Sequence, residues 1–383
     1  MRIVRGERLT PLMSAELQNL GSNDFAEILA RVHPASHTYV TIGVFDGVHR
    51  GHQRLITRMI EAAHATDGVA VVLTFDPHPA VTLSACDVDR ADIEHASGRA
   101  FDGRRQPFDS PFLLTTVEER AEVLAALGLD ILVVLPFTQA TARTPATDFV
   151  DALVRHLHLT QLWGGLDFAI GHRREGDIPF LRRLGAERGF TVHVVGPLVW
   201  EGALVSSSRV RVALEAGDLS HVTGCLGRPY RLTGSVVHGR EVGHSIGIPT
   251  ANISPPPGRL VPASGVYACQ AHTERLGTYP SVTNIGVRPT FGPSSDSAAP
   301  RIGNSLLCGA GGRKTPVVET HLLDFDADLY GQVLALDFVA RLRDERTFPA
   351  SEALVEQIYS DIAQARAILD GVRSPALLQD NFV

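Results

Sequence analysis

Residues 41–53 read TIGVFDGVHRGHQ, and this stretch decides the fold of the first half of the chain. The apolar, β-branched run 39–45 predicts a buried strand, and apolar residues at helical spacing from His52 to Ala65 predict a helix directly after it. A glycine-containing turn before a helix N-terminus exposes backbone amides, and the helix dipole there favours an anion. The stretch therefore predicts a phosphate-binding turn.

Two histidines, His49 and His52, lie three positions apart in this turn. Imidazole N–H groups placed there can donate hydrogen bonds to phosphoryl oxygens and stabilise the charge that grows on an α-phosphate during in-line attack. Such a pair could also be two surface histidines or metal ligands, but no third Cys or His lies at the usual ligand spacing. The pattern favours a phosphate site and needs no covalent intermediate.

The alternation of strand and helix continues to about residue 200. Glu119 lies three residues after Thr116 and predicts a capping box at the start of a helix, and 148–157 predicts another helix. Further strands are predicted at 69–75, 131–137, 161–165 and 190–195. Near-continuous apolar strands separated by amphipathic helices indicate a parallel sheet covered on both faces, which binds ligands at the carboxyl ends of its strands.

The second half has a different pattern. Short β-rich runs separated by Gly and Pro predict an antiparallel barrel or sandwich, and 351–370 predicts a closing helix with Ser351 as its N-cap. We expect loops at 80–112 and 293–316, and a tail at 374–383. The fold class is thus α/β followed by an antiparallel β domain.

The composition narrows the class of protein. The chain has 383 residues, of which 44% are hydrophobic and 20% are charged, and its net charge is −7. These values are typical of a globular chain of two or three domains and argue against a nucleic-acid partner. No apolar run is long enough for a membrane span, and the N-terminus lacks a secretory signal, so we expect a cytoplasmic protein. The sequence defines no oligomeric state.

Several motifs together resemble the prokaryotic bifunctional riboflavin kinase/FAD synthetase (FMN adenylyltransferase) family. In the first half these are the turn itself, FDPHP (75–79), LTTVEER (114–120), PFTQATA (136–142) and VSSSRVR (205–211). In the second half they are GIPTAN (247–252), NIGVRPTF (284–291), VETHLLDFD (318–326) and DLYG (328–331). The resemblance implies a Rossmann-like nucleotidyltransferase domain with a parallel sheet at 1–220, and an antiparallel β-barrel riboflavin kinase domain with a closing helix at 221–373.

The resemblance also implies site residues and small-molecule substrates. It makes His49, His52 and Arg209 catalytic in the transfer of AMP from ATP to FMN. It makes Glu319 the base that takes the proton from the riboflavin 5′-hydroxyl when ATP phosphorylates it. Mg²⁺ is implied at Thr250 and Asn252. The residues that it assigns to nucleotide or flavin binding are Gly43, Phe45, Asp46, Gly47, Gly51, Asp167, Ser207, Ser208, Gly239, Gly247, Thr250 and Asn252.

The chain departs from the family pattern at a few positions. Ala169 and Ile170 replace bulkier or basic residues, Val242 and His244 stand where arginines are common, and Ser208 replaces Thr. These differences keep two alternatives open. One is a paralogue with weakened kinase activity that transfers a nucleotidyl group to another flavin-like or phosphorylated acceptor. The other is a flavin-binding regulator with an inactive kinase module.

Overall fold

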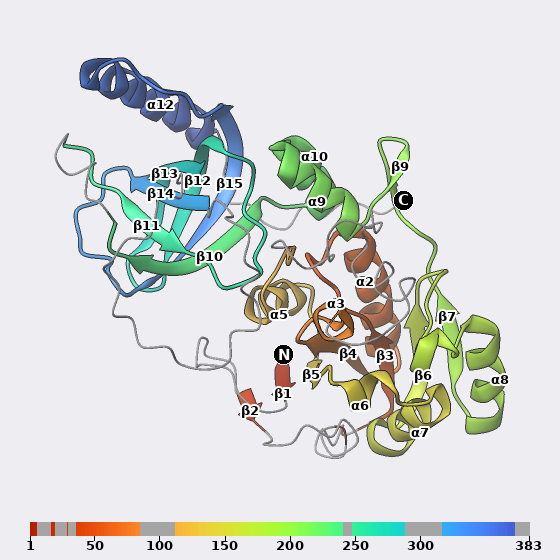
Figure 1. The fold of residues 1–383 in the computed structure, drawn as a ribbon. Helices are drawn as coiled ribbons and strands as arrows, with labels where there is room; N and C mark the ends of the chain where they lie inside the picture. Colours follow the sequence, from red (N-terminus) through yellow and green to blue (C-terminus); the bar gives the residue numbers. More distant parts are fainter. Residues whose placement is uncertain are drawn as a thin grey trace. The chain divides into compact units, whose positions relative to one another are not determined.

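The fold is that of a computed structural model (Figure 1), which describes residues 1–5, 17–19, 29, 36–84, 112–239, 247–287 and 316–371. Contacts divide the chain into two compact units, and the division falls between Arg209 and Val210, inside helix α9 (Ser207–Ala216). The domain boundary predicted between residues 220 and 221 stays a prediction. Each unit has a hydrophobic core of its own.

The N-terminal unit is built on one seven-stranded sheet in the order β2-β1-β5-β4-β3-β6-β7. All neighbouring strands are parallel, which confirms the predicted parallel sheet. The strands are β1 Arg2–Arg5, β2 Leu17–Asn19, β3 Thr38–Ile42, β4 Val69–Asp76, β5 Ile131–Pro136, β6 Leu159–Gly164 and β7 Thr191–Val194. The first two strands were not predicted.

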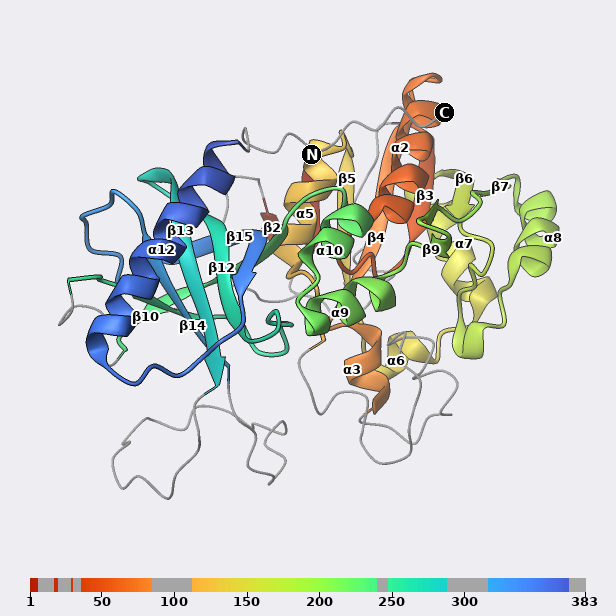
Figure 2. The same cartoon turned by 90° about the horizontal axis from the view of Figure 1, so that it is seen from above.

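Helices cover both faces of this sheet, as Figures 1 and 2 show. The helices are α2 Arg50–His64, α3 Pro79–Ser84, α5 Val117–Ala126, α6 Gln139–Ala142, α7 Ala146–Leu157 and α8 Ile178–Arg188, with the 3₁₀ turn η1 at His172–Arg174 and a small hairpin of β8 (Val199–Trp200) and β9 (Ala203–Leu204). Helix α3 occupies the start of the predicted loop 80–112, and residues 85–111 lie outside the described part.

Alternate residues of the central strands enter two different cores. In β4, Val71 and Leu73 pack with α7 and α8, whereas Ala70 and Val72 pack with α2 and α5. A strand that is buried on both faces needs an apolar side chain at every position. This requirement explains the continuous apolar runs of the sequence.

The first predicted strand ends earlier than expected. β3 stops at Ile42, and residues 43–49 form the connection to α2, in which Phe45, Gly47 and Val48 have φ values of 50°, 79° and 38°. These left-handed conformations cannot continue a strand. Apolar composition alone did not reveal them, so the prediction of 39–45 was too long by three residues.

The C-terminal unit contains a closed six-stranded barrel in the order β10-β11-β14-β13-β12-β15, and every pair is antiparallel. This confirms the predicted antiparallel barrel. Helix α10 (Leu219–Leu226) precedes it. The strands are β10 Tyr230–Val237, β11 Ala251–Ser254, β12 Gly265–Thr273, β13 Gly277–Val287, β14 Pro316–Leu322 and β15 Val333–Arg343. Most of the predicted loop 293–316 and the predicted tail lie outside the described residues.

Helix α12 (Ser351–Asp370) has the predicted bounds and lies along the outside of the barrel (Figure 2). Ala365 and Leu369 are buried against Val266 and Val282. The predicted cap was wrong by one residue, because Ala350 is the N-cap and Ser351 is already helical. In the part of the chain that the structure describes, no helix has the length and apolar character needed to span a membrane.

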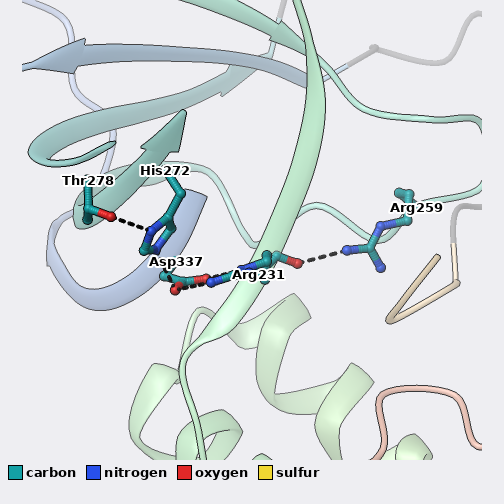
Figure 3. Close-up of polar contacts among 5 residues, drawn as sticks. All are labelled: Arg231, Arg259, His272, Thr278 and Asp337. Carbon is teal, nitrogen blue, oxygen red and sulfur yellow. Dashed lines mark hydrogen bonds and ion pairs between the residues drawn. The ribbon is translucent and has the colours of Figure 1, made fainter. Parts of the chain in front are cut away.

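A buried ion network joins three strands of the barrel (Figure 3). Asp337 of β15 accepts hydrogen bonds from Arg231 of β10 at 2.7 and 2.8 Å and pairs with His272 of β12 at 2.8 Å. Thr278 bonds the other nitrogen of His272, and Arg259 donates to the Arg231 carbonyl. Burial acts to raise the pKa of the Asp337 carboxyl, but these bonds outweigh it and hold the pKa below its ordinary value.

We expect Asp337→Asn to destabilise the barrel by about 2–4 kcal/mol, because Arg231 and His272 lose the anion that they share. Differential scanning calorimetry should show a lower unfolding temperature for one transition. Asp326→Asn, at an exposed position, is the matched control. Equal unfolding temperatures for both variants and the parent protein would contradict a stabilising role of the network.

Candidate functional site

A cavity of about 1300 Å³ lies at the carboxyl ends of the sheet strands in the N-terminal unit. Gly43 follows β3, Phe75 lies at the end of β4, Phe137 follows β5 and Gly165 follows β6, and all four line it. This is the edge of a parallel sheet at which ligands bind. Of the predicted residues in this unit, Gly43, Phe45, His49, Gly51, His52 and Asp167 line the cavity.

Asp46 anchors the turn between β3 and α2. Its carboxylate is buried and accepts hydrogen bonds from the backbone N–H groups of Leu114 and Thr115 at 3.0–3.1 Å and from the Thr115 hydroxyl. The N–H of Gly47 donates to the same hydroxyl at 3.0 Å. Asp46 and Gly47 thus fix the turn to the segment before α5, and neither is among the residues that line the cavity.

His49 is the N-cap of α2. Its Nδ1 accepts the backbone N–H of His52 at 3.3 Å, so a neutral His49 ring carries its proton on Nε2. A Cβ on Gly51 would lie 3.1 Å from the His49 ring. A glycine at position 51 therefore leaves space for the His49 ring in this orientation.

His52 stacks on His49, with ring centroids 3.6 Å apart, and meets Phe45 edge to face, with ring centroids 5.1 Å apart. Burial, with a smaller contribution from the Arg120 charge, lowers the pKa of His52 to about 3. Its Nδ1 is buried and has no hydrogen-bond partner among the described residues. A neutral imidazole with an unsatisfied nitrogen at a cavity wall is suited to hydrogen bonding with a ligand.

The head of α9 lies against this turn. Ser207 Oγ donates to the carbonyl oxygen of Asp46 at 2.8 Å, and Ser206 Oγ accepts the backbone N–H of Arg209 at 3.2 Å. Ser206 thus acts as a helix cap and lines the cavity. Ser207 and the half-buried Ser208 lie in the first turn of the helix.

Arg209 contacts the hairpin of β8 and β9. Its Nη1 donates to the carbonyl oxygens of Trp200 and Ala203 at 2.7 and 3.0 Å, and its guanidinium carbon lies 5.1 Å from the centre of the Trp200 ring. Arg209 is not among the residues that line the cavity. Arginine carries five donors, so Nε and Nη2 are further groups that can face an anion.

Sequence reasoning missed the cations of the cavity wall. Arg143, Arg173 and Arg174 line it, and so do Ala169 and Ile170, at which the chain departs from the family pattern. The run HRR at 172–174 follows GLDFAIG directly. Its basic residues could have been noticed in the sequence, but no pattern placed them beside the histidines.

In the barrel, two predicted residues lie opposite each other. Asn252 of β11 pairs in register with Glu319 of β14, and Glu319 pairs on its other side with Asn284 of β13. Residues in direct register on neighbouring strands have Cβ atoms about 5 Å apart and share one face of the sheet. Sequence reasoning named the segment 284–291 but not Asn284 as a site residue.

Asn252 offers an oxygen for a metal or a phosphate-bound ligand. It is buried, and its Oδ1 has no partner among the described residues. A Cβ on Gly239 would collide with the Asn252 amide, so the backbone of Gly239 covers it closely. Thr250 and Gly247, with φ 75°, lie just before β11. Residues 240–246, with Val242 and His244, lie outside the described part.

Mg²⁺ prefers oxygen ligands, and Asn252, Thr250 and Glu319 provide them. Among the described residues no group of three His, Cys, Asp or Glu side chains is arranged for a metal ion. A site with few carboxylates suits a magnesium ion that keeps waters and is shared with substrate phosphates. The residues present therefore fit the implied ion.

Two family models match the chain, one described as FAD synthetase over residues 32–209 and the other as riboflavin kinase over residues 226–369. A bifunctional riboflavin kinase/FMN adenylyltransferase of Pseudomonas fluorescens is 35% identical over 86% of this chain and 92% of its own. The protein of the same name from Escherichia coli K12 is 33% identical over 90% and 96%.

A solved structure is also similar. A protein of Streptococcus pneumoniae described as a macrolide-efflux protein matches with a TM-score of 0.70 and 25% identity, over 88% of this chain and 96% of its own. The shared feature is the fold along most of both chains.

The lowered pKa of His52 predicts a stability change with pH. Between its unfolded pKa of 6.5 and its folded pKa of about 3, only the unfolded chain takes up this proton, so stability falls as the pH falls through this window. When the pH falls from 7 to 5, we expect His52 to lower the free energy of unfolding by about 1–2 kcal/mol. His52→Gln should remove that part of the loss, measured by urea unfolding followed through Trp163 and Trp200 fluorescence.

His156→Gln is the control, because His156 lies in the last turn of α7 and does not line the cavity. It should keep the pH dependence of the parent protein. If His52→Gln also keeps it, the imidazole of His52 is not held neutral by burial.

Proposed function

Because the chain belongs to the family of bifunctional riboflavin kinase/FMN adenylyltransferases, we propose that it makes FAD from riboflavin in two steps. The barrel unit phosphorylates riboflavin with ATP to give FMN and ADP. The N-terminal unit transfers AMP from a second ATP to FMN and releases pyrophosphate. Domains of 1–220 and 221–373 and a cytoplasmic location are part of the proposal.

In the first step, we assign the base to Glu319. Its carboxylate takes the proton of the riboflavin 5′-hydroxyl as that oxygen attacks the γ-phosphorus of ATP, and the bond from the γ-phosphorus to the bridging oxygen of ADP breaks. Asn252 and Thr250 would hold Mg²⁺, which neutralises charge on the phosphates when bound. Gly239 and Gly247 border this site and let the backbone approach a nucleotide.

In the second step, an oxygen of the FMN phosphate attacks the α-phosphorus of ATP, and the bond to pyrophosphate breaks. His49 and His52 donate hydrogen bonds to the α-phosphoryl oxygens, and as neutral rings they act as donors at fixed positions. A positioned donor of this kind contributes on the order of 10²–10³-fold to the rate. Gly43 and Gly51 let the phosphate approach the rings, and Phe45 packs against His52 and holds it in place.

At the head of α9, we assign the remaining phosphates of ATP to Ser207, Ser208 and Arg209. The helix N-terminus favours an anion, and Arg209 brings a fixed charge to it. Asp46 and Gly47 position the turn, because their contacts run to the segment before α5. Asp167 contacts the nucleotide or flavin from the loop after β6.

The observation that carries the proposal is the stacked pair of imidazoles on the cavity wall, with a buried nitrogen that lacks a partner. Incubation with riboflavin, ATP and Mg²⁺ should yield FMN and then FAD when products are separated by chromatography over time. Turnover with CTP or a non-flavin acceptor but not with FMN and ATP would favour the paralogue. Tight flavin binding without ATP consumption would favour the regulator.

We expect the two activities to be lost separately. His49→Ala should reduce FAD formation from FMN by at least about 10²-fold and leave FMN formation unchanged. Glu319→Gln should reduce FMN formation by about 10²–10⁴-fold and leave FAD formation from added FMN unchanged.

His156→Ala and Glu356→Gln are the matched controls, since both lie on helices outside the two sites. Each should retain both activities. If either test variant loses both activities while it is still folded, the division of labour between the units is wrong.

Asn252→Ala should raise the Mg²⁺ concentration for half-maximal FMN formation by about tenfold, because a metal ligand or its neighbour is lost. The Mg²⁺ dependence of FAD formation should stay unchanged. Titration of Mg²⁺ in both assays measures this, and an equal shift in both, or in neither, would argue against a metal at Asn252.

A further inference from the structure

The cavity of the N-terminal unit has to hold two phosphorylated substrates, yet the imidazole pair brings no fixed charge to it. Burial keeps His52 neutral, and His49 uses Nδ1 as a helix cap. The charged residues that line the cavity in the described chain are three arginines, Arg143, Arg173 and Arg174, and one acid, Asp167. The wall is therefore positive, although the whole chain carries −7.

Two of these arginines lie at the tip of a small closed loop. Ile170 and Gly176 bond each other through both backbone groups, at 3.1 and 2.9 Å, and close the base of the loop. A Cβ on Gly171 would lie 2.5 Å from the backbone nitrogen of Ala146, and a Cβ on Gly176 would lie 2.7 Å from the Ala146 Cβ. Both glycines are thus needed for the loop to pack on the first residue of α7.

Further bonds tie the loop to the segment between α6 and α7. Glu175 accepts the backbone N–H of Ala146 at 2.8 Å, the backbone N–H of His172 donates to the Thr144 carbonyl at 2.9 Å, and the His172 ring bonds the Ala142 carbonyl at 3.2 Å. Arg143 belongs to the same segment. The three cations are therefore carried by two backbone segments that are bonded to each other.

The tip of the loop adopts a costly backbone conformation. Arg173 and Arg174 have φ values of 51° and 60°, which residues other than glycine rarely adopt. Such conformations are unfavourable and persist where the surrounding structure holds them, often at binding sites. Arg174 also donates to the Asp167 carbonyl at 2.6 Å, which holds its guanidinium against the turn after β6.

The same cavity also has an aromatic wall. The rings of Phe75 and Phe137 meet edge to face, with centroids 5.3 Å apart, and both line the cavity. Phe137 begins the segment that leads through α6 to Arg143, and Phe149 of α7 lines the cavity as well. A flat aromatic ring fits such a wall, and the arginines on the wall of the same cavity are available to its phosphate.

We propose that the loop 170–176 and Arg143 bind the 5′-phosphate of FMN and hold it for attack on the α-phosphorus of ATP. Arg173 and Arg174 provide charge-assisted hydrogen bonds, and the closed loop positions them before the ligand arrives. The site is distinct from the head of α9, to which the proposed function assigns the other ATP phosphates. The inference rests on the proposed adenylyl transfer.

The test is steady-state adenylyl transfer with FMN varied at saturating ATP, and with ATP varied at saturating FMN. Arg174→Ala and Arg173→Ala should each raise KM for FMN by about 10–100-fold and change KM for ATP less than twofold. Arg174→Lys should recover part of the affinity, since it restores the charge but not the planar fork. FMN formation by the barrel in the same chain should be unchanged, and the unchanged KM for ATP reports that the mutated N-terminal unit is still folded.

Arg182→Ala is the matched control, because this exposed arginine of α8 does not line the cavity. It should keep both KM values. An increase in KM for ATP alone, or unchanged KM values in all arginine variants, would overturn the inference while the parent protein still makes FAD. Absence of FAD formation by the parent protein would instead overturn the proposed function.

Discussion

The buried carboxylate of Asp46 is the contact on which the N-terminal site depends. It fixes a turn with three left-handed residues by accepting the backbone N–H groups of Leu114 and Thr115. The carbonyl of the same residue accepts the hydroxyl of Ser207. Asp46 thus joins the end of β3, the segment before α5 and the head of α9. The two histidines follow this residue in the same turn, so its contacts fix their positions.

In the proposed adenylyl transfer, the arrangement separates two tasks that phosphate chemistry requires. There the imidazoles at the head of α2 act as neutral hydrogen-bond donors to a developing charge, because burial keeps the His52 ring uncharged. Fixed positive charge lies elsewhere, on the arginines of the cavity wall and at Arg209 near the hairpin. Keeping the imidazoles neutral avoids adding two further charges to a cavity that three arginines already line.

The barrel builds its site in another way. Antiparallel register places Asn252, Glu319 and Asn284 in one row across three strands, although they are far apart in the sequence. The network of Asp337, Arg231 and His272 ties β15 to β10 and β12. A closed barrel has no free edge strands, so the register of that row is held from all sides.

The sequence by itself determined the parallel sheet, an antiparallel barrel or sandwich after it, the closing helix and the imidazole pair. Each depends on local periodicity or on a motif within about ten residues, and hydrophobic periodicity reports directly which face is buried. The prediction from sequence misplaced the end of β3 and the N-cap of α12. Apolar composition reports neither left-handed φ values nor the residue at which a helix begins. Only the tertiary structure decided that Asp46 is an anchor, that Arg209 contacts a hairpin, and that Arg173 and Arg174 line the same cavity as His49. The contacts of Asp46 and the position of the arginines depend on segments distant in the chain, and even the nearby contact of Arg209 depends on how the hairpin folds back, because no local pattern records which donor meets which acceptor after folding.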